Sequence, residues 1–285
     1  MLELGRFKLH AVMDGYFGLD GGAMFGIVPK PLWEKQFPAD EKNRIRLALR
    51  CLLVEAGARR ILVDDGMGDK WSEKQAGIYG IERPEGGLVD GLARLGFTPD
   101  DVTDVILTHL HFDHAGGTTR RQVDGSVGLA FPRATYHLQR RNWDWARQPT
   151  ERDAGSYLPE NFAALEASGR LHLVDGEAEL FPGLRVIPSE GHTTALQLVR
   201  IDGGGRTLVY CSDVVPTAAH LRASWIMGYD LRPLTMLEEK KKLLADALAG
   251  DWILFFEHEP RFPACRVRES GERAGEAVQG EVVVV

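Results

Sequence analysis

Residues 108 to 117 read Thr-His-Leu-His-Phe-Asp-His-Ala-Gly-Gly and hold three of the nine histidines of the chain. The aliphatic run Val105-Ile106-Leu107 comes directly before them, which predicts a buried strand that delivers the polar residues to a loop at its end. In extended chain the imidazoles of His109 and His111 point to the same side, because the side-chain period of a strand is two. Both rings can therefore reach one metal ion.

Two further polar residues of this stretch, Asp113 and His114, follow where the chain is expected to turn, and there they can face a second ion close to the first. Gly116 and Gly117 would let the backbone pass close to the ions, because glycine has no Cβ. Imidazole and carboxylate ligands suit zinc, iron, manganese or cobalt better than magnesium or calcium, which prefer oxygen ligands. Core packing and solubility explain the spacing HxHxDH poorly, so we interpret it as a metal site.

This stretch resembles the signature of the metallo-β-lactamase superfamily. The resemblance implies a later histidine, a later aspartate and a last histidine, each at the end of a strand. The sequence has His192, Asp213 and His258 in that order, each after a predicted strand. Asp64 ends an earlier strand-like run and resembles the aspartate that, in the family, holds a ligating histidine by its far ring nitrogen.

The resemblance assigns a role to each of these residues. The expected ligands are His109, His111 and His192 for one ion, Asp113, His114 and His258 for the other, and Asp213 as the bridge between them. The cofactors would be two divalent metal ions, with zinc as the first choice and iron, manganese or cobalt as alternatives. A water between two cations about 3.5–4 Å apart loses its proton near neutral pH, and the bridging hydroxide would attack a carbonyl carbon. The second ion or Asp113 would help the alkoxide to leave and take up a proton.

The resemblance leaves one catalytic position open. In the best-known lactonases of the superfamily, a tyrosine soon after the bridging aspartate assists the substrate oxygen. Here those positions hold Val214, Val215 and Pro216, so the assisting group is missing or has moved. His220 is the candidate replacement, and an ordinary loop histidine is the alternative interpretation.

The expected fold class is α+β: an αβ/βα sandwich in which two mixed β-sheets are flanked by helices, with the site at one edge. We expect residues 1–285 to form a single domain of this fold. Strand-like runs at 49–55 and 60–64 predict a hairpin. Residues 237–248 have the apolar spacing of an amphipathic helix.

The segment 19–33 combines glycines and prolines with apolar residues, so we expect no regular element there. Apolar side chains on an irregular loop suggest a lid over a pocket or a dimer contact. The segment resembles the N-terminal loop of the quorum-quenching acyl-homoserine-lactone lactonases of the Bacillus type, whose neighbours include methyl parathion hydrolases. The resemblance implies a homodimer. The expected substrate pocket consists of Met24, Phe25, Ile27, Trp33, Trp143 and Trp225.

The predicted activity is metal-dependent hydrolysis of a lactone ring, with N-acyl homoserine lactones as the first choice of substrate. A phosphotriesterase or arylesterase of the methyl parathion hydrolase type is the alternative, because a similar metal site serves both and the pocket decides. A metal-bearing binding or redox protein is the non-enzymatic alternative. Di-iron oxygen-reducing relatives normally carry glutamate at the second motif histidine and add a flavin domain, and we find neither here.

Composition narrows the class of protein further. The chain has 285 residues, of which 44% are hydrophobic, so it can bury a sizeable core. A net charge of −7 argues against a nucleic-acid partner, which usually leaves a basic footprint. Neither a secretory signal nor a membrane-spanning stretch is apparent. Three widely spaced cysteines, Cys51, Cys211 and Cys265, do not suit a disulfide framework, and we expect a cytoplasmic protein.

Overall fold

Strands dominate the N-terminal half of the computed structural model, which describes residues 1–271 and 276–285. Within these ranges, one seven-stranded sheet has the order β1 (Leu2–Leu4), β2 (Phe7–Asp20), β3 (Arg44–Ala56), β4 (Arg59–Val63), β5 (Asp104–Ile106), β8 (Thr135–Gln139) and β9 (Leu171–Val174). Strands β1 to β4 pair antiparallel, and β4, β5, β8 and β9 pair parallel. The sheet is therefore mixed, and the predicted hairpin corresponds to β3 and β4.

A second sheet takes up the C-terminal half. In the described residues it has seven strands in the order β10 (Ala178–Phe181), β11 (Leu184–Ser189), β12 (Leu196–Gly203), β13 (Arg206–Tyr210), β14 (Ile253–Phe255), β15 (Ala264–Glu269) and β16 (Ala277–Val283). All neighbours are antiparallel except β13 and β14. A small ribbon, β6 (Thr119–Arg121) and β7 (Val127–Leu129), stands apart from both sheets.

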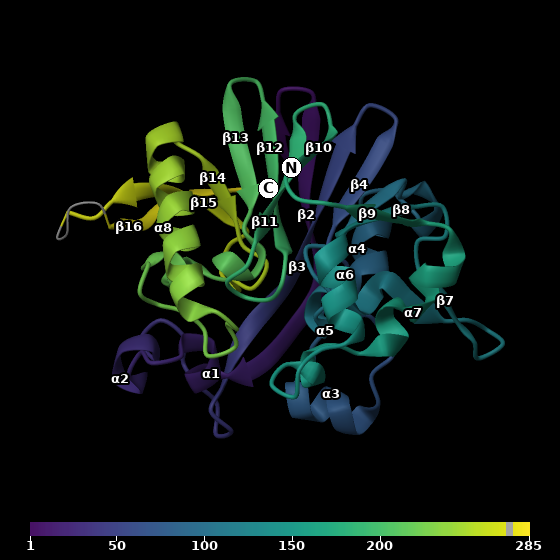
Figure 1. The fold of residues 1–285 in the computed structure, drawn as a ribbon, viewed down its shortest axis with the longest axis horizontal. Coiled ribbons are helices and arrows are strands. Elements are labelled where there is room, and N and C mark those ends of the chain that lie inside the picture. Colours follow the sequence, from purple (N-terminus) through teal and green to yellow (C-terminus); the bar gives the residue numbers. More distant parts are fainter. Residues whose placement is uncertain (272–275) are drawn as a thin grey trace.

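The helices lie outside the two sheets. Their bounds are α1 (Gly21–Phe25), α2 (Lys30–Trp33), α3 (Glu73–Tyr79), α4 (Leu88–Arg94), α5 (Phe112–Ala115), α6 (Arg140–Arg147), α7 (Pro159–Ser168) and α8 (Pro233–Gly250). Short 3-10 helices are η1 (Pro99–Asp101), η2 (Gly116–Thr118), η3 (Ala154–Ser156), η4 (Ser212–Val214) and η5 (Ala218–Leu221). Figure 1 shows α8 on one side of the strands and α4, α6 and α7 on the other. None of the helices in the described residues is long and apolar enough to cross a membrane.

The side chains of the central strand β3 point alternately to the two faces of the first sheet, so they pack in two layers of the core. Leu52 and Val54 point into the core between the two sheets, whereas Cys51 and Leu53 point to the helices that cover the first sheet. A third apolar cluster joins the second sheet to α8. A strand that is covered on both faces needs a nearly continuous apolar run, and β3 is apolar from Leu47 to Val54 except at Arg50. The predicted αβ/βα sandwich is therefore confirmed.

The segment 19–33 differs from the expectation of an irregular loop. It contains the end of β2 and the short helices α1 and α2, and Asp20 caps α1 by accepting a hydrogen bond from the Ala23 amide at 2.8 Å. Met24, Phe25 and Trp33 are buried in a fourth apolar cluster, next to the first residues of β3. These apolar side chains therefore form part of the chain's own core.

Candidate metal centre

Chain turns at the ends of strands bring the motif residues together. The motif follows β5, and α5 begins at Phe112, directly after His111. The amide of Gly116 donates to the carbonyl of Gly66 at 2.7 Å, which ties the end of α5 to the segment after β4. A Cβ at Gly116 would lie 2.2 Å from the Met67 carbonyl oxygen. The glycine is thus required for contact with the neighbouring backbone, and not, as the sequence suggested, for an approach to the metals.

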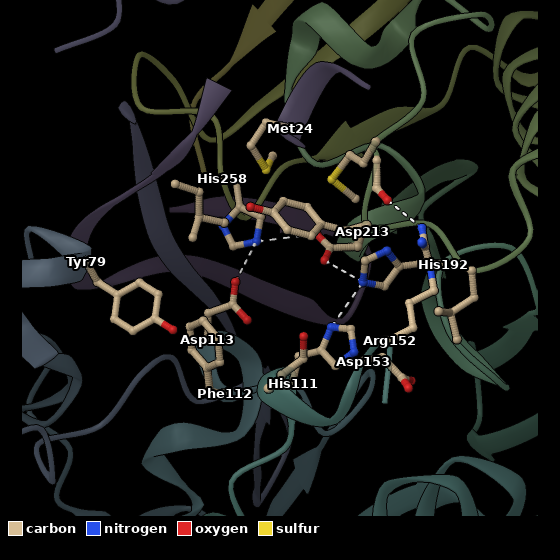
Figure 2. A pocket seen from close by; sticks show the side chains of 17 residues that line it. Met24, Tyr79, His111, Phe112, Asp113, Arg152, Asp153, His192, Asp213 and His258 are labelled. Carbon is tan, nitrogen blue, oxygen red and sulfur yellow. Dashed lines mark hydrogen bonds and ion pairs between the residues drawn. The ribbon is translucent and has the colours of Figure 1, made fainter. Parts of the chain in front are cut away.

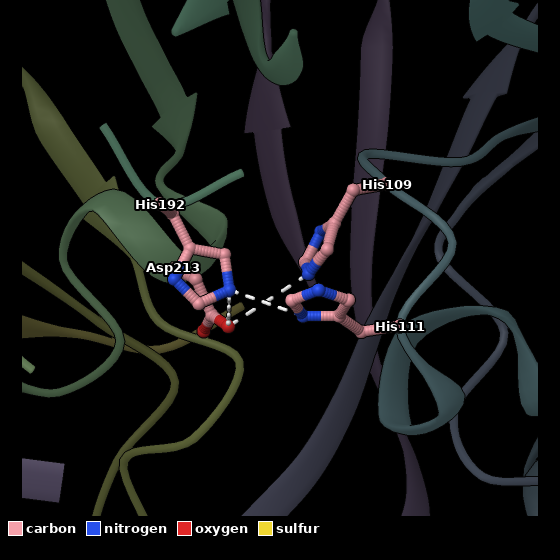
Figure 3. Close-up of side chains that lie close together, drawn as sticks. All are labelled: His109, His111, His192 and Asp213. Atoms are coloured by element: carbon pink, nitrogen blue, oxygen red, sulfur yellow. Dashed lines mark hydrogen bonds and ion pairs between the residues drawn. The ribbon is translucent and has the colours of Figure 1, made fainter. Parts of the chain in front are cut away.

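The first group of predicted ligands consists of His109, His111, His192 and Asp213, which offer ligand atoms within 4.8 Å of one another (Figure 3). The Nε2 atom of His192 lies 3.1 Å from Nδ1 of His111 and 3.0 Å from Oδ2 of Asp213. The Nε2 atom of His109 lies 3.8 Å from the same carboxylate oxygen. Three imidazoles and a carboxylate therefore converge on one point.

The second group consists of Asp113, His114 and His258, again with ligand atoms within 4.8 Å of one another. The Nε2 atoms of the two histidines are 3.3 Å apart. Oδ1 of Asp213 lies 3.3 Å from His258 Nε2, and its Oδ2 lies 3.4 Å from His114 Nε2. The carboxylate of Asp213 thus contacts both groups, which is the position that a bridging ligand requires.

Unpartnered polar atoms indicate that these groups fit metal ions. His109 Nε2, His111 Nε2 and Asp213 Oδ1 are buried and have no hydrogen-bond partner among the described residues. A buried polar atom without a partner costs free energy, so such atoms in a native structure call for an explanation. The donor set, imidazole nitrogen with carboxylate oxygen, suits zinc and similar divalent ions. A pair of such ions would satisfy His109 Nε2 and Asp213 Oδ1, whereas His111 faces the ligand group through Nδ1.

The protonation of the imidazoles follows from burial and from neighbouring charges. Burial, with a contribution from the other histidines, lowers the pKa of His109 and of His111 well below the usual range, so both are neutral. Burial also acts to lower the pKa of His192, but the carboxylates of Asp213 and Asp230 outweigh it and raise this pKa to about 10. Metal ions that bind here would displace protons, because a ligating histidine must be neutral.

Outer partners hold the rings of the predicted ligands. Nδ1 of His114 lies 3.0 Å from Asp64 Oδ2 and 2.7 Å from Glu257 Oε2. Nδ1 of His192 lies 2.8 Å from Asp230 Oδ1. Asp64 stands where the sequence interpretation expected it, whereas Asp230 and Glu257 were missed. Glu257 could have been noticed as an acid beside a ligand at the end of an apolar strand, but Asp230 has no local signal.

The candidate assisting residue His220 is not part of the site. Its Nε2 donates to the Met24 carbonyl at 2.9 Å, its Nδ1 lies 2.8 Å from the Thr217 hydroxyl, and its ring stacks on Phe25 with centroids 4.8 Å apart. Burial lowers its pKa to about 3, so the ring is neutral. His220 is absent from the cavity lining among the described residues. Both nitrogens are engaged elsewhere, which corrects the expectation that this side chain assists the substrate.

A cavity of about 370 Å³ opens over the two groups of ligands (Figure 2). It is lined by five of the predicted ligands, His111, Asp113, His192, Asp213 and His258. The apolar part of its wall consists of Leu19, Met24, Phe112, Met227 and Leu231. The polar part consists of Tyr79, Arg152, Asp153, Ser156 and Tyr229, with Gly155 and Gly228 between. The cavity is of the size that small-molecule sites usually have.

Of the six residues predicted for the substrate pocket, the structure places only Met24 in the cavity wall. Phe25 and Trp33 stack on each other, with centroids 5.4 Å apart, and Trp225 packs edge-on against Phe25. Trp143 packs against Phe162 in the core beneath the helices. Ile27 is 94% exposed. The prediction failed because an apolar residue in a loop can pack under its own segment as readily as over a site.

Comparisons with known proteins agree with this geometry. Residues 49–258, more than half of the chain, match the model of the metallo-beta-lactamase superfamily. N-acyl homoserine lactonases are similar in sequence. The one from Bacillus sp is 28% identical over 166 residues, which is 55% of this chain but only 59% of that protein. The one from Bacillus thuringiensis is 28% identical over 246 residues, which is 78% of this chain and 86% of that protein.

Solved structures are also similar to this one. A probable metal-dependent hydrolase from Staphylococcus aureus superposes with a TM-score of 0.88 at 30% identity, over 99% of this chain and 100% of that one. The dizinc quorum-quenching lactonase AidC superposes with a TM-score of 0.81 at 23% identity, over 99% of this chain and 97% of that one, and this likeness concerns the fold alone. The family model, the αβ/βα sandwich and the two adjoining groups of ligands lead to one conclusion: the chain belongs to the metallo-beta-lactamase superfamily.

Proposed function

We propose that the protein opens the lactone ring of N-acyl homoserine lactones and that it uses two divalent metal ions, with zinc as the proposed metal. The observation that carries this proposal is the division of the cavity wall above the ligand groups. An apolar part can accept the acyl chain, and Arg152 and Ser156 on the polar part can bind the amide. The similarity to lactonases of Bacillus supports the same substrate class.

The chain's own residues have distinct tasks in this reaction. Divalent ions, when bound, would polarise the ring carbonyl and lower the pKa of a water to near neutrality. A water oxygen adds to the carbonyl carbon, the ring C–O bond breaks, and the ring oxygen takes up a proton to give the open N-acyl homoserine. Asp113 lines the cavity, and we propose that it carries the proton to the leaving oxygen. The buried imidazoles, Asp113 and Asp213 would hold the two ions.

The length of the acyl chain tests the substrate class. We expect kcat/KM to rise severalfold when the chain is lengthened from about four to about eight carbons, at up to about 0.8 kcal/mol per buried methylene. Met24→Ala should flatten this dependence, because Met24 is in the apolar wall. Leu234→Ala on α8 is the control, because Leu234 is 78% exposed and does not line the cavity, and it should keep the wild-type slope.

The relative turnover of lactones and phosphotriesters distinguishes a lactonase from a phosphotriesterase. A flat dependence on chain length, together with faster turnover of paraoxon-like triesters than of any lactone, would favour the phosphotriesterase instead. A triester offers no aliphatic tail, so the apolar wall would then have another purpose. Metal content and turnover should be measured on the same preparation, so that a protein without metal is not mistaken for one without activity.

We also propose a homodimer, formed through the segment 19–33. Ile27 and Leu32 are 94% and 49% exposed, and burying them in a two-fold contact would remove apolar surface from water. Met24, Phe25 and Trp33 lie inside the chain's own core, so they do not form the contact surface that the sequence suggested. Light scattering should report a dimer for the wild type and a monomer for the double variant Ile27→Asp, Leu32→Asp. A monomeric wild type at micromolar concentration would contradict this.

We also propose that the protein is cytoplasmic, and its three cysteines support this. Cys51, Cys211 and Cys265 are all buried and free. Free thiols without a disulfide partner are typical of a reducing compartment.

A further inference from the structure

The cavity holds two tyrosine hydroxyls that the proposed chemistry does not use. Tyr79 is the last residue of α3, and Tyr229 lies in the loop that leads to α8. Among the described residues, neither hydroxyl has a hydrogen-bond partner. Each is therefore free to bind a substrate atom. Nothing in the local sequence distinguishes these two residues from the other tyrosines of the chain.

Orientation distinguishes Tyr79. Figure 2 shows its hydroxyl directed into the cavity toward Asp113, with His192 and Arg152 on the opposite side. A substrate group that reaches Asp113 therefore also comes close to the Tyr79 hydroxyl. The Tyr79 ring packs against the fourth apolar cluster at its edge and is only partly buried. Its hydroxyl is the one polar group that α3 contributes to the cavity wall in the described part of the chain.

Aromatic packing holds the Tyr79 ring in this orientation. Its centroid lies 5.0 Å from that of Phe112 and 5.3 Å from that of Trp71, and the two neighbours contact each other edge-on. Trp71 is fixed in turn, because its Nε1 donates to the Met67 carbonyl at 2.8 Å. Phe112 directly precedes Asp113 in the chain. The same aromatic cluster therefore positions both the Tyr79 ring and the neighbouring Asp113.

The helix that carries Tyr79 is fixed at both ends. Ser72 and Gln75 form a reciprocal capping box at its N-terminus. At its C-terminus, the Arg44 guanidinium donates to the carbonyls of Gly77 and Ile78, at 3.0 and 2.7 Å. A donor that is already in place costs little reorganisation when charge develops, and such donors contribute strongly to catalysis.

We propose that Tyr79 is a catalytic residue, whose hydroxyl donates a hydrogen bond to the leaving oxygen of the scissile ester as the C–O bond breaks. This rests on the proposed function, because Asp113 is the group that we propose protonates that oxygen. Tyr79 keeps its own proton throughout: the proton that ends on the leaving oxygen passes through Asp113. Burial and the Asp113 carboxylate raise the pKa of Tyr79, so the hydroxyl is a donor at neutral pH.

The test is the dependence of rate on the leaving group. Tyr79→Phe removes one oxygen and keeps the ring that packs on Trp71 and Phe112, so metal content and melting temperature should match those of the wild type. We expect kcat to fall about 10²-fold on lactones and alkyl esters, the usual effect of removing one such donor. On a 4-nitrophenyl ester the loss should stay below about threefold, because a stable phenolate needs little help. A plot of log kcat against leaving-group pKa should therefore be steeper for the variant.

Tyr229→Phe is the matched control. Tyr229 lines the same cavity, so its variant is expected to change rates by a similar factor for every leaving group. Equal losses for Tyr79→Phe across the series, or no loss, would overturn the proposal. Sensitivity to the leaving group in Tyr229→Phe alone would also overturn it. If the wild type hydrolyses aryl esters or phosphotriesters but no lactone, the proposed function fails, yet the same series with those substrates still tests Tyr79.

Discussion

At the scale of single residues, four of the five predicted metal-binding imidazoles, all except His111, have a second polar partner on the far side of the ring. His192 has Asp230, His114 has both Asp64 and Glu257, and His258 Nδ1 lies 2.8 Å from the Ala48 carbonyl oxygen. Such partners orient the ring and raise its basicity as a ligand. The site is therefore arranged by the fold before any ion binds.

The first prediction concerns Asp213. We expect the purified protein to carry close to two metal ions per chain, and Asp213→Ala to lose at least one of them and all hydrolysis. The carboxylate contacts both groups of ligands and would neutralise charge on both ions. Elemental analysis measures the occupancy. Asp246→Ala, a partly exposed residue on α8 that belongs to neither ligand group, serves as the control. Unchanged occupancy in Asp213→Ala would show that Asp213 is not a bridging ligand.

The second prediction concerns the outer partner that the sequence did not reveal. Asp230→Asn should weaken binding of the ion at the His192 group by about 10- to 100-fold, the usual effect of losing such a partner. The substitution keeps the shape of the side chain but removes its charge, and Asp230 is buried beside His192. Competition with a chelator of known affinity measures the change. Asp246→Asn should bind like the wild type, and an equal affinity for Asp230→Asn would show that the contact has no effect on the metal.

At the scale of elements, the site depends on how closely α5 and η2 approach the segment that follows β4. The amide of Gly116 bonds to Gly66, and the amide of Asp65 donates to the His114 carbonyl at 2.9 Å. These two contacts connect the motif to the end of a neighbouring parallel strand. Parallel strands end at the same edge of a sheet, which is why residues from β4 and β5 meet here.

The third prediction tests this close approach. Gly116→Ala would place a Cβ 2.2 Å from the Met67 carbonyl oxygen, so α5 or its neighbour must move. We expect a loss of about 1–3 kcal/mol in the free energy of unfolding, as for other overpacked sites, together with weaker metal binding. Urea denaturation measures the first and elemental analysis the second.

Gly77→Ala is the matched control in α3, where a new Cβ would meet nothing within 4 Å. It should stabilise the protein by up to about 1 kcal/mol, because alanine favours helix. If both variants behave alike, the contact of Gly116 with the Met67 backbone does not constrain the site.

At the scale of the whole molecule, the buried amine of Lys240 destabilises the folded state. Lys240 on α8 is 1% exposed, and its Nζ donates to the Trp225 carbonyl at 2.6 Å. Burial lowers its pKa from 10.5 to about 8, although Asp230 acts in the opposite direction. Below pH 8 the amine is charged in both the folded and the unfolded state, and its burial then destabilises the fold in full.

The fourth prediction follows from the sign of this shift. Between about pH 8 and pH 10.5 the unfolded state binds more protons at Lys240 than the folded state, so the contribution of this group to stability rises with pH. Relative to Lys240→Met, the wild type should gain up to about 3 kcal/mol in the free energy of unfolding as the pH is raised through this window. Urea denaturation at pH 7.5 and pH 10 measures the gain. An unchanged difference between the two proteins would mean that the amine titrates normally.

The sequence by itself determined the αβ/βα sandwich and the seven residues that the structure assembles into two ligand groups. The motif is local, because alternation along a strand decides that His109 and His111 share a side. Each later ligand follows an apolar strand, and strand ends of a sheet meet at an edge. Ligands whose placement depends on the side-chain period of a strand and on where the strand ends can therefore be predicted from the sequence.

Only the tertiary structure decided what covers the site. Asp230 reaches His192 over 38 residues of sequence, and His220 turned out to bond with Met24 across 196 residues. Tyr79 of α3 lines the cavity. The apolar residues around Trp33 pack in the chain's own core instead. The physical reason is that the periodicity of a sequence indicates which face of a helix or strand is apolar. It does not indicate which distant segment packs against that face, or which polar side chain that segment places at the site.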